Sequence, residues 1–228
     1  MPELSENHRK LSDALSACAA RSGHPVRLLA VSKTQPAEAV AACSALGQRA
    51  FGENYVQEAL EKIAALKALA LEWHLIGPLQ SNKCRPVAEH FDWVQTVDRG
   101  KIIDGLSQFR PVGLPPLNVL IQVNVDDEAS KSGCAPALIE SLAEQIAAKP
   151  NLRLRGLMAI PDPAHSADGH AFAAMQSLYK SLKERHPGID TLSMGMSDDF
   201  PLAIAHGANL VRVGSALFGA RPKKTETP

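Results

Sequence analysis

The feature that most constrains the fold is a regular alternation along nearly the whole chain. Short apolar runs that favour β-structure are separated by longer stretches in which apolar residues recur at helical spacing. Such an order of strand, helix and strand predicts a parallel sheet, because parallel strands need a long crossover connection between them. The runs lie at residues 26–33, 49–53, 72–77, 92–98, 117–125, 152–160, 191–197 and 209–219.

Eight such units within 228 residues favour a closed (β/α)8 barrel, which commonly occupies about 200–250 residues as one domain. A doubly wound open sheet is the alternative, but no GxGxxG follows the first run. We therefore expect one barrel domain over residues 1–228, with an extra helix within residues 3–22 and a loose tail at 221–228. Helical spacing is clearest at residues 36–47, 54–70, 134–149 and 167–186.

The charge balance excludes several classes of partner. The chain carries 24 basic and 24 acidic side chains, so nothing indicates a general attraction to nucleic acid or to an anionic membrane. No apolar run approaches the roughly 20 residues that span a bilayer. The first residues are polar and have helical spacing, unlike a signal peptide. We expect a cytoplasmic protein.

The cysteines and histidines do not form a metal-binding pattern. Cys18, Cys43, Cys84 and Cys134 are scattered without a close pair, and the eight histidines form neither HExxH nor HxH. We expect reduced, buried or half-buried thiols and no metal site.

In a barrel of this kind, function lies at the carboxyl ends of the strands. These ends bring together one amine, one guanidinium and several small polar residues, without the paired carboxylates of a glycosidase or an acidic cluster for Mg²⁺. In chain order they present Lys33, Gly52 to Asn54, His74, Gly77, Thr96, Asn124, Met158 to Ile160, Met194 to Ser197, and Arg212 to Ser215.

The last two strand ends resemble a phosphate site. Gly195 and Ser197 come directly before an expected helix, which Ser197 could cap while its hydroxyl donates to an anion. Gly214 allows close backbone approach, and Ser215 adds another hydroxyl. Ordinary capping and a tight turn are the alternative for each motif alone. Their joint position after the seventh and eighth strands favours a phosphate.

Lys33 follows an apolar strand, which raises the question of what its amine does there. A solvated charge is the plain alternative, whereas a partly apolar barrel mouth is expected to lower its pKa and free the amine as a nucleophile. An amine across the barrel from a phosphate pocket suits a Schiff base with pyridoxal 5′-phosphate.

Arg212 stands two residues before Gly214, so strand alternation points both to the same side. Against a pyridoxal ring, its guanidinium would face the pyridine nitrogen. A guanidinium does not give up its proton, so that nitrogen stays unprotonated and the ring becomes a weak electron sink. An ion pair inside the barrel rim is the alternative role.

Seven motifs in order resemble one family over residues 5–220. They are AVSKTQP, FGENYVQE, WHLIGPLQSNK, LIQVNVDDEASKSG, RGLMAIP, SMGMSDD and VRVGSALFG, and the chain is similar through them to the pyridoxal phosphate homeostasis proteins, the YggS/PROSC family. The resemblance implies the barrel of the alanine racemase N-terminal domain, typically monomeric or weakly associated, with the cofactor bound covalently. It also implies a role in vitamin B6 homeostasis without established catalysis, in which the protein holds pyridoxal phosphate or other B6 vitamers and passes the cofactor to apo-enzymes.

The resemblance also assigns residues. It implies that Lys33 forms the Schiff base, that Asn54 hydrogen-bonds the phenolic oxygen, and that Arg212 faces the pyridine nitrogen. The phosphate would be held by Ser197 and the Met196 backbone together with Gly214 and Ser215. His74 and residues 80–83 match the family without a firm role, and residues 129–133 are expected to form a polar loop close to the opening.

Two other functions remain open. A weakly active amino-acid racemase needs two bases on opposite faces of the substrate carbon. In the alanine racemases that the barrel resembles, the second base is a tyrosine from a separate C-terminal domain, and this sequence ends soon after its last run. Its tyrosines are Tyr55, at an expected helix start near the rim, and Tyr179, in the middle of an outer helix. The third reading is a generic phosphate-ligand barrel in which Lys33 is only an electrostatic contact.

Overall fold

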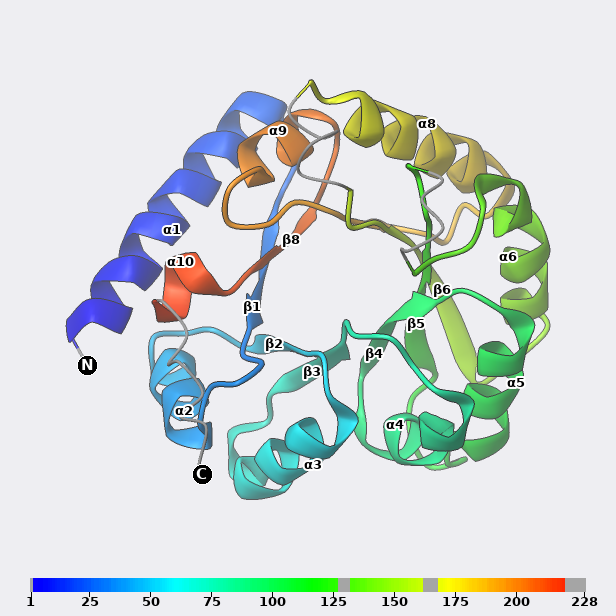
Figure 1. Cartoon of the computed structure of the whole chain (residues 1–228), viewed down its shortest axis with the longest axis horizontal. Coiled ribbons are helices and arrows are strands. Elements are labelled where there is room, and N and C mark those ends of the chain that lie inside the picture. Colours follow the sequence, from blue (N-terminus) through cyan, green and yellow to red (C-terminus); the bar gives the residue numbers. More distant parts are fainter. Residues whose placement is uncertain (1, 127–131, 162–167, 220–228) are drawn as a thin grey trace, which may run out of the picture.

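The computed structural model describes residues 2–126, 132–161 and 168–219, and these form a closed barrel of eight parallel strands surrounded by helices (Figure 1). Consecutive strands pair in sequence order, and β8 pairs with β1 to close the ring. The predicted (β/α)8 barrel is confirmed. The predicted tail at 221–228 and most of the predicted loop at 129–133 lie outside the described residues.

Each apolar run of the sequence contains one strand. The last run, residues 209–219, extends beyond its strand, because after Gly214 the chain turns into a helix whose Phe218 N–H donates to the Gly214 carbonyl at 2.9 Å. The strands are β1 Arg27–Val31, β2 Ala50–Glu53, β3 Glu72–Leu75, β4 Trp93–Val97, β5 Leu117–Gln122, β6 Leu152–Met158, β7 Thr191–Ser193 and β8 Leu210–Val213.

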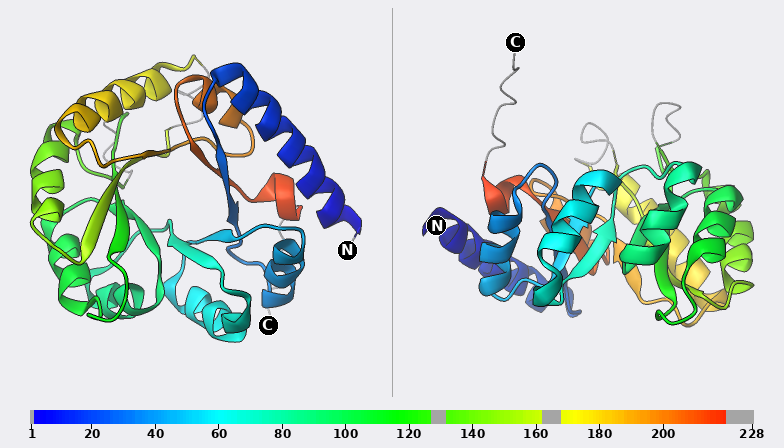
Figure 2. Two further views of the ribbon diagram at one scale, coloured as in Figure 1. Left: turned by 180° about the vertical axis from the view of Figure 1, so that it is seen from behind. Right: turned by 90° about the horizontal axis from the view of Figure 1, so that it is seen from below.

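The helices form the outer ring, which the two views of Figure 2 show from behind and from below. They are α1 Pro2–Ser22, α2 Ala37–Ala45, α3 Val56–Ala65, α4 Cys84–His90, α5 Gly100–Phe109, α6 Ile139–Ala147, α8 His170–Arg185, α9 Phe200–Ala205 and α10 Ser215–Phe218. Single 3-10 turns occur at Lys67–Leu69, Ser81–Lys83 and Pro136–Leu138.

The predicted N-terminal helix is present as α1 and packs beside α9 and α10. Leu4, Leu11, Leu15 and Cys18 are buried along it, at a spacing that places them on one helical face. The Asn7 side chain donates to the Leu217 carbonyl of α10 at 3.2 Å. The first helix of the chain therefore supports the last turn that follows β8.

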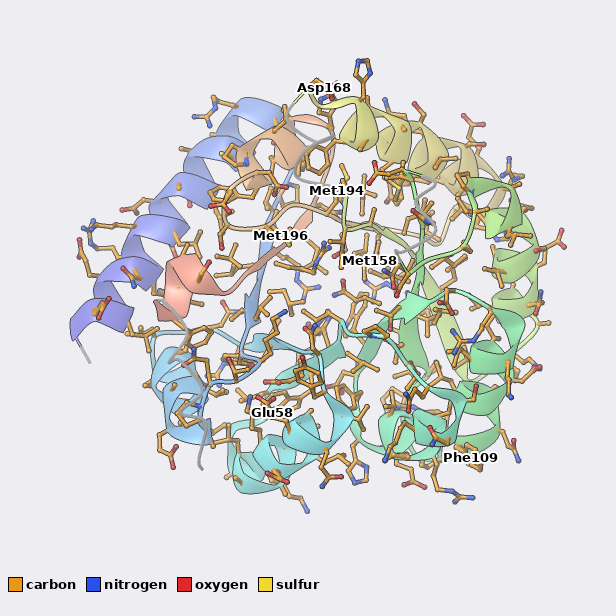
Figure 3. All side chains as sticks on the ribbon, in the orientation of Figure 1. Glu58, Phe109, Met158, Asp168, Met194 and Met196 are labelled. Carbon is orange, nitrogen blue, oxygen red and sulfur yellow. The ribbon has the colours of Figure 1, made fainter. Side chains whose placement is uncertain are left out.

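Strand alternation divides the apolar core into an outer and an inner part. The outer part, between strands and helices, is the larger and includes Phe51, Trp73 and Phe172. The barrel interior holds two small clusters, one of Leu29, Ala50, Ile76 and Leu210 and one of Trp93, Leu120 and Met158. Met158 lies in the central region in Figure 3.

Candidate functional site

A pocket of about 200 Å³ lies at the carboxyl ends of the strands. All seven residues proposed from the sequence for a cofactor site line it, and they come from four places that are far apart in the chain. The pocket is lined by Val31, Lys33, Asn54, Ile76, Ile160, Met196, Ser197, Asp198, Arg212, Gly214 and Ser215.

Four wall residues were not assigned to the site from the sequence: Val31, Ile76 and Asp198, which were not singled out, and Ile160, which was named only as part of a strand end. Alternation carried a signal for two of them, because Val31 stands two residues before Lys33, and Ile76 stands two residues after the inward-facing His74. Ile160 and Asp198 follow the ends of β6 and β7, where the period of two no longer applies.

A tight turn ends β1 and brings Lys33 to the pocket. The Gln35 N–H donates to the Ser32 carbonyl at 3.0 Å, and the Thr34 N–H donates to Glu58 Oε1 at 2.6 Å. Thr34 has a φ of 65°, a left-handed conformation that is unfavourable for a β-branched residue. The backbone strain therefore lies directly beside the amine that lines the pocket.

The loops after β7 and β8 come together in this pocket. The hydroxyls of Ser197 and Ser215 are 3.2 Å apart. A Cβ on Gly214 would stand 3.2 Å from the Val31 carbonyl oxygen, so this glycine permits the close approach of the β8 end to β1. Two hydroxyls beside a glycine-bearing turn form a polar corner that can donate to an anion.

The structure corrects the expected cap of α9. The residue before this helix is Asp199, not Ser197, and Asp199 Oδ1 accepts a hydrogen bond from the Met196 N–H at 2.6 Å. The Met196 N–H is thus engaged within its own loop, and its residue contributes a wall of the pocket. Ser197 keeps its hydroxyl directed to Ser215.

The structure also corrects the expected placement of Lys33 across the barrel from the phosphate corner. Because closure of the barrel pairs β1 with β8, Lys33 lies beside that corner. Lys33, Gly214 and Ser215 also line a second, small cavity together. A ligand anchored at both places therefore spans the seam between the first and last strands.

Arg212 is 3% exposed and faces the barrel interior below the pocket. Its Nη1 donates to Ser193 Oγ at 2.8 Å and its Nη2 to the Ala159 carbonyl at 2.8 Å. Burial lowers the pKa of Arg212 to about 10, against the opposing effect of Asp199, so the guanidinium stays charged at neutral pH. Within the described residues no ion pair forms on it, and the rim ion-pair alternative lacks support.

A chain of buried hydrogen bonds continues from Arg212 through the barrel. Ser193 Oγ donates to Gln95 Oε1 at 2.7 Å, and Gln95 Nε2 donates to His74 Nδ1 at 2.9 Å. His74 Nε2 lies 2.8 Å from Glu72 Oε1. The donors run in one direction only if His74 carries its proton on Nε2, which fixes its tautomer.

His74 is therefore a structural hydrogen-bonding residue of the interior and does not line the pocket. It is fully buried and stacks on Trp93, with ring centroids 5.0 Å apart. Burial lowers the pKa of His74 despite the neighbouring Glu72 carboxylate, so the ring is neutral at pH 7. Burial acts to raise the pKa of Glu72, but hydrogen bonds from His74 and Arg27 prevail and lower it to about 2.

An apolar cavity of about 360 Å³ adjoins the pocket. The two share Asn54, Ile76, Ile160 and Met196 as walls. Four further residues line this cavity and not the pocket. Two are prolines, and the other two are Gln122 and Ser132, whose polar side chains are neutral. Among the described residues, the walls of this apolar cavity include no basic side chain that could bind a substrate carboxylate.

Neither tyrosine lines the pocket. Tyr55 is 61% exposed and stands immediately before α3, as expected from the sequence. Tyr179 is half-buried on the outer helix α8, and its ring lies 3.2 Å from the position that a Cβ on Gly156 would take. The pocket therefore has an amine on one side and no tyrosine to serve as a second base.

Residues 2–126, 132–161 and 168–219 lack two further kinds of feature. No helix there is both long and apolar enough to cross a membrane. No three histidine, cysteine, aspartate or glutamate side chains converge there on a site for a metal ion. The four cysteines are all buried and unpaired.

Comparison with known proteins gives consistent results. A family model described as "Alanine racemase, N-terminal domain" matches residues 7–222. Pyridoxal phosphate homeostasis proteins of Pseudomonas aeruginosa and Escherichia coli K12 are 56% and 52% identical, over 97% of this chain and 97–98% of theirs.

Solved structures agree with these relatives. The structure of PipY from Synechococcus elongatus with PLP bound is 37% identical, with a TM-score of 0.82, over 95% of this chain and all of that one. Alanine racemase from Corynebacterium glutamicum shares the fold at 16% identity and a TM-score of 0.73, and the match covers 63% of its chain. With its barrel, its ordered motifs and these relatives, the chain belongs to the pyridoxal phosphate homeostasis protein family.

Proposed function

We propose that this protein binds pyridoxal 5′-phosphate covalently through Lys33 and serves in the homeostasis of that cofactor. One observation carries the proposal: Lys33, Arg212 and the Ser197–Ser215 corner meet in a single pocket of about 200 Å³. The names of the curated relatives and the PLP-bound state of PipY support it.

The residues fit this cofactor. Sites for drug-sized ligands have volumes of roughly 300–1,000 Å³. This pocket is smaller, which suits a small ligand with one ring and one phosphate group. The Ser197 and Ser215 hydroxyls and the Gly214 turn supply donors for a phosphate, and Val31, Ile76 and Ile160 supply apolar walls for a ring. Asn54 also lines the pocket, and its amide can donate to the ring hydroxyl.

The bound cofactor supplies an aldehyde, which a neutral primary amine converts to an imine with loss of water. Lys33 provides that amine from the turn after β1. Arg212 is held by Ser193 and the Ala159 carbonyl, and its remaining N–H groups are available to donate to the pyridine nitrogen. Because Arg212 keeps its proton at neutral pH, it would leave the ring nitrogen of a bound cofactor unprotonated, and the ring would then be a weak electron sink.

These features support holding the cofactor without turnover. Racemisation needs a second base, and both tyrosines lie away from the pocket walls. We extend the proposal to transfer of the cofactor, or of another B6 vitamer, to apo-enzymes by a cytoplasmic monomer. The equal numbers of acidic and basic side chains fit a protein without a nucleic-acid partner.

The test is capture of the cofactor by purified protein. Addition of pyridoxal phosphate is expected to give a visible absorption band, and borohydride reduction followed by peptide mass mapping should place one adduct on Lys33. Lys33→Ala should lose the band, whereas the control Lys180→Ala, on the exposed side of α8, should keep it. No adduct in the wild type, or an adduct that persists elsewhere in Lys33→Ala, refutes the proposal.

Catalysis is tested separately with single enantiomers of amino acids and chiral analysis of the products. We expect no turnover above that of free pyridoxal phosphate. Racemisation that depends on Lys33 and is lost in Tyr55→Phe would favour the racemase.

A further inference from the structure

A buried charge cluster lies behind Lys33, on the outer side of the barrel wall. Lys62 of α3 donates to Glu53 Oε1 at 2.7 Å, to Glu58 Oε1 at 2.6 Å and to the Ser32 carbonyl at 2.7 Å. All three protons of its ammonium group are therefore used. The Lys62 and Glu53 side chains are 6% and 0% exposed, and Glu58 is 28% exposed.

The cluster holds the residues on both sides of Lys33. Ser32 Oγ donates to Glu53 Oε1 at 2.6 Å while the Ser32 carbonyl accepts from Lys62. On the other side, the Thr34 N–H donates to Glu58 Oε1 at 2.6 Å. Glu58, labelled in Figure 3, thus connects α3 to the turn that presents the reactive amine.

The conformation held in this way is an unfavourable one. Thr34 has a φ of 65°, which a β-branched residue adopts only when its surroundings impose it. The hydrogen bond from the Thr34 N–H to Glu58 helps to hold Thr34 in this conformation. Loss of Glu58 would let Thr34 return to an extended conformation and would reorient Lys33.

Fold stability alone does not account for these groups. Buried ion pairs are often replaced by apolar residues without loss of stability, because removing charge from water is costly. Here the cost is visible: Glu53 Oε2 is buried without a hydrogen-bond partner, and burial raises the pKa of Glu53 against the bonds from Lys62 and Ser32. Every partner of the cluster outside β2 and α3 belongs to the turn that carries Lys33.

We propose that Glu53, Glu58 and Lys62 are positioning residues that fix the Ser32–Thr34 turn and so set the rate at which Lys33 captures an aldehyde. This inference rests on the proposed function. In the capture step, the neutral Lys33 nitrogen would bond to the aldehyde carbon, and the carbonyl oxygen would leave as water with the two amine protons. Lys62 itself takes no part, because its ammonium group donates to three acceptors.

The test separates positioning from pocket integrity in Glu58→Ala. Binding of pyridoxine 5′-phosphate, which has no aldehyde, reports the pocket, and stopped-flow absorbance with pyridoxal phosphate reports covalent capture. We expect unchanged affinity for pyridoxine 5′-phosphate and capture slowed about tenfold or more, a factor that corresponds to a barrier increase of about 1.4 kcal/mol. Glu89→Ala is the matched control, because Glu89 forms a similar pair with Arg85 on α4, away from the site.

Two rescue variants sharpen the test. Glu58→Gln keeps an oxygen that can accept from the Thr34 N–H, so it should recover most of the rate. Adding Thr34→Gly to Glu58→Ala should also recover part of it, because glycine adopts a positive φ without strain. Lys62→Met would leave the Glu53 carboxylate buried without its cation, so the two Glu58 variants, which keep that pair, decide the matter.

The outcomes distinguish this inference from the proposed function. A wild type that captures no pyridoxal phosphate overturns the proposed function. A wild type and a Glu58→Ala variant that capture it at equal rates overturn only the positioning role. A variant that loses pyridoxine 5′-phosphate affinity and capture in parallel shows a general structural role and also overturns it.

Discussion

At the scale of single residues, the interior of the barrel is a directed line of hydrogen bonds. It leads from Arg212 through Ser193, Gln95 and His74 to Glu72. A buried guanidinium needs its donors satisfied, since an unpaired charged group costs more than a neutral one. This line holds the charged Arg212 at the pocket, and among the described residues no carboxylate forms an ion pair with it.

The neutral state of His74 has a consequence for pH. Burial lowers the pKa of His74 in the folded protein below its ordinary value of 6.5. At a pH between the folded pKa and 6.5, the unfolded chain therefore binds a proton that the native protein does not. Stability should therefore fall as the pH drops below about 6.5, by at most about 1.4 kcal/mol per pH unit. Urea unfolding followed by circular dichroism between pH 5 and 7.5 measures this slope.

His74→Gln should flatten that slope, because glutamine can keep both hydrogen bonds and does not titrate. His170→Gln is the control, since His170 is exposed on α8 and should leave the slope unchanged. An identical slope in wild type and His74→Gln would mean that another group is responsible.

The convergence of the proposed site residues was predictable from the sequence where it follows from strand ends. Lys33, Asn54, Ser197, Arg212, Gly214 and Ser215 meet because each stands just after a strand, or in Arg212's case inside one, and parallel strands end together. The Glu53–Lys62 cluster was not predictable, because it depends on how α3 lies against β1 and β2. The engaged Met196 N–H also depends on a loop geometry that no periodicity encodes.

At the scale of elements, two backbone segments approach each other closely where the ends of β2 and β3 meet beside the pocket. A Cβ on Gly77, just after β3, would stand 2.2 Å from the Asn54 carbonyl oxygen, which is backbone and cannot rotate away. The absence of a side chain at Gly77 therefore lets the loop after β3 lie against Asn54. Packing at this point and the geometry of the pocket wall are coupled.

Gly77→Ala should displace Asn54 and weaken binding of pyridoxine 5′-phosphate, together with a loss of about 1–3 kcal/mol in the free energy of unfolding. Gly188→Ala is the matched control, because nothing lies within 4 Å of its added Cβ and its φ is ordinary. Calorimetric titration and urea unfolding of both variants check the prediction. Equal affinities in the two variants would contradict it.

The elements themselves were well predicted because alternation of strand and helix is a repeated signal. All eight runs contain a strand, but the runs at 191–197 and 209–219 extend several residues beyond β7 and β8. The prediction was least accurate for the last run, at residues 209–219. Its SALF segment is compatible with strand or helix, and the hydrogen bonds to the Gly214 carbonyl select a helix. Local preference alone does not decide such a turn.

At the scale of the whole molecule, the closing contact of the barrel is the pairing of β1 with β8. Arg27 pairs with Leu210 and Ala30 with Val213, so residues from the two ends of the chain lie side by side. Contacts of such high sequence separation cost the most chain entropy to close. The proposed cofactor would attach to Lys33 after β1 and to Ser215 after β8, and it would therefore clamp this seam.

Bound pyridoxal phosphate should then stabilise the fold and do so unevenly. At a free concentration one hundred times the Kd, linkage gives about 2.7 kcal/mol, or a rise in Tm of about 5–10 °C for a chain of this size. Hydrogen exchange should slow most in β1 and β8 and little in β4 and β5, which lie far from the seam. Lys33→Ala should keep only the smaller gain from the phosphate corner. Uniform protection around the ring, or none in β1, would show that the ligand does not bridge the two ends of the chain.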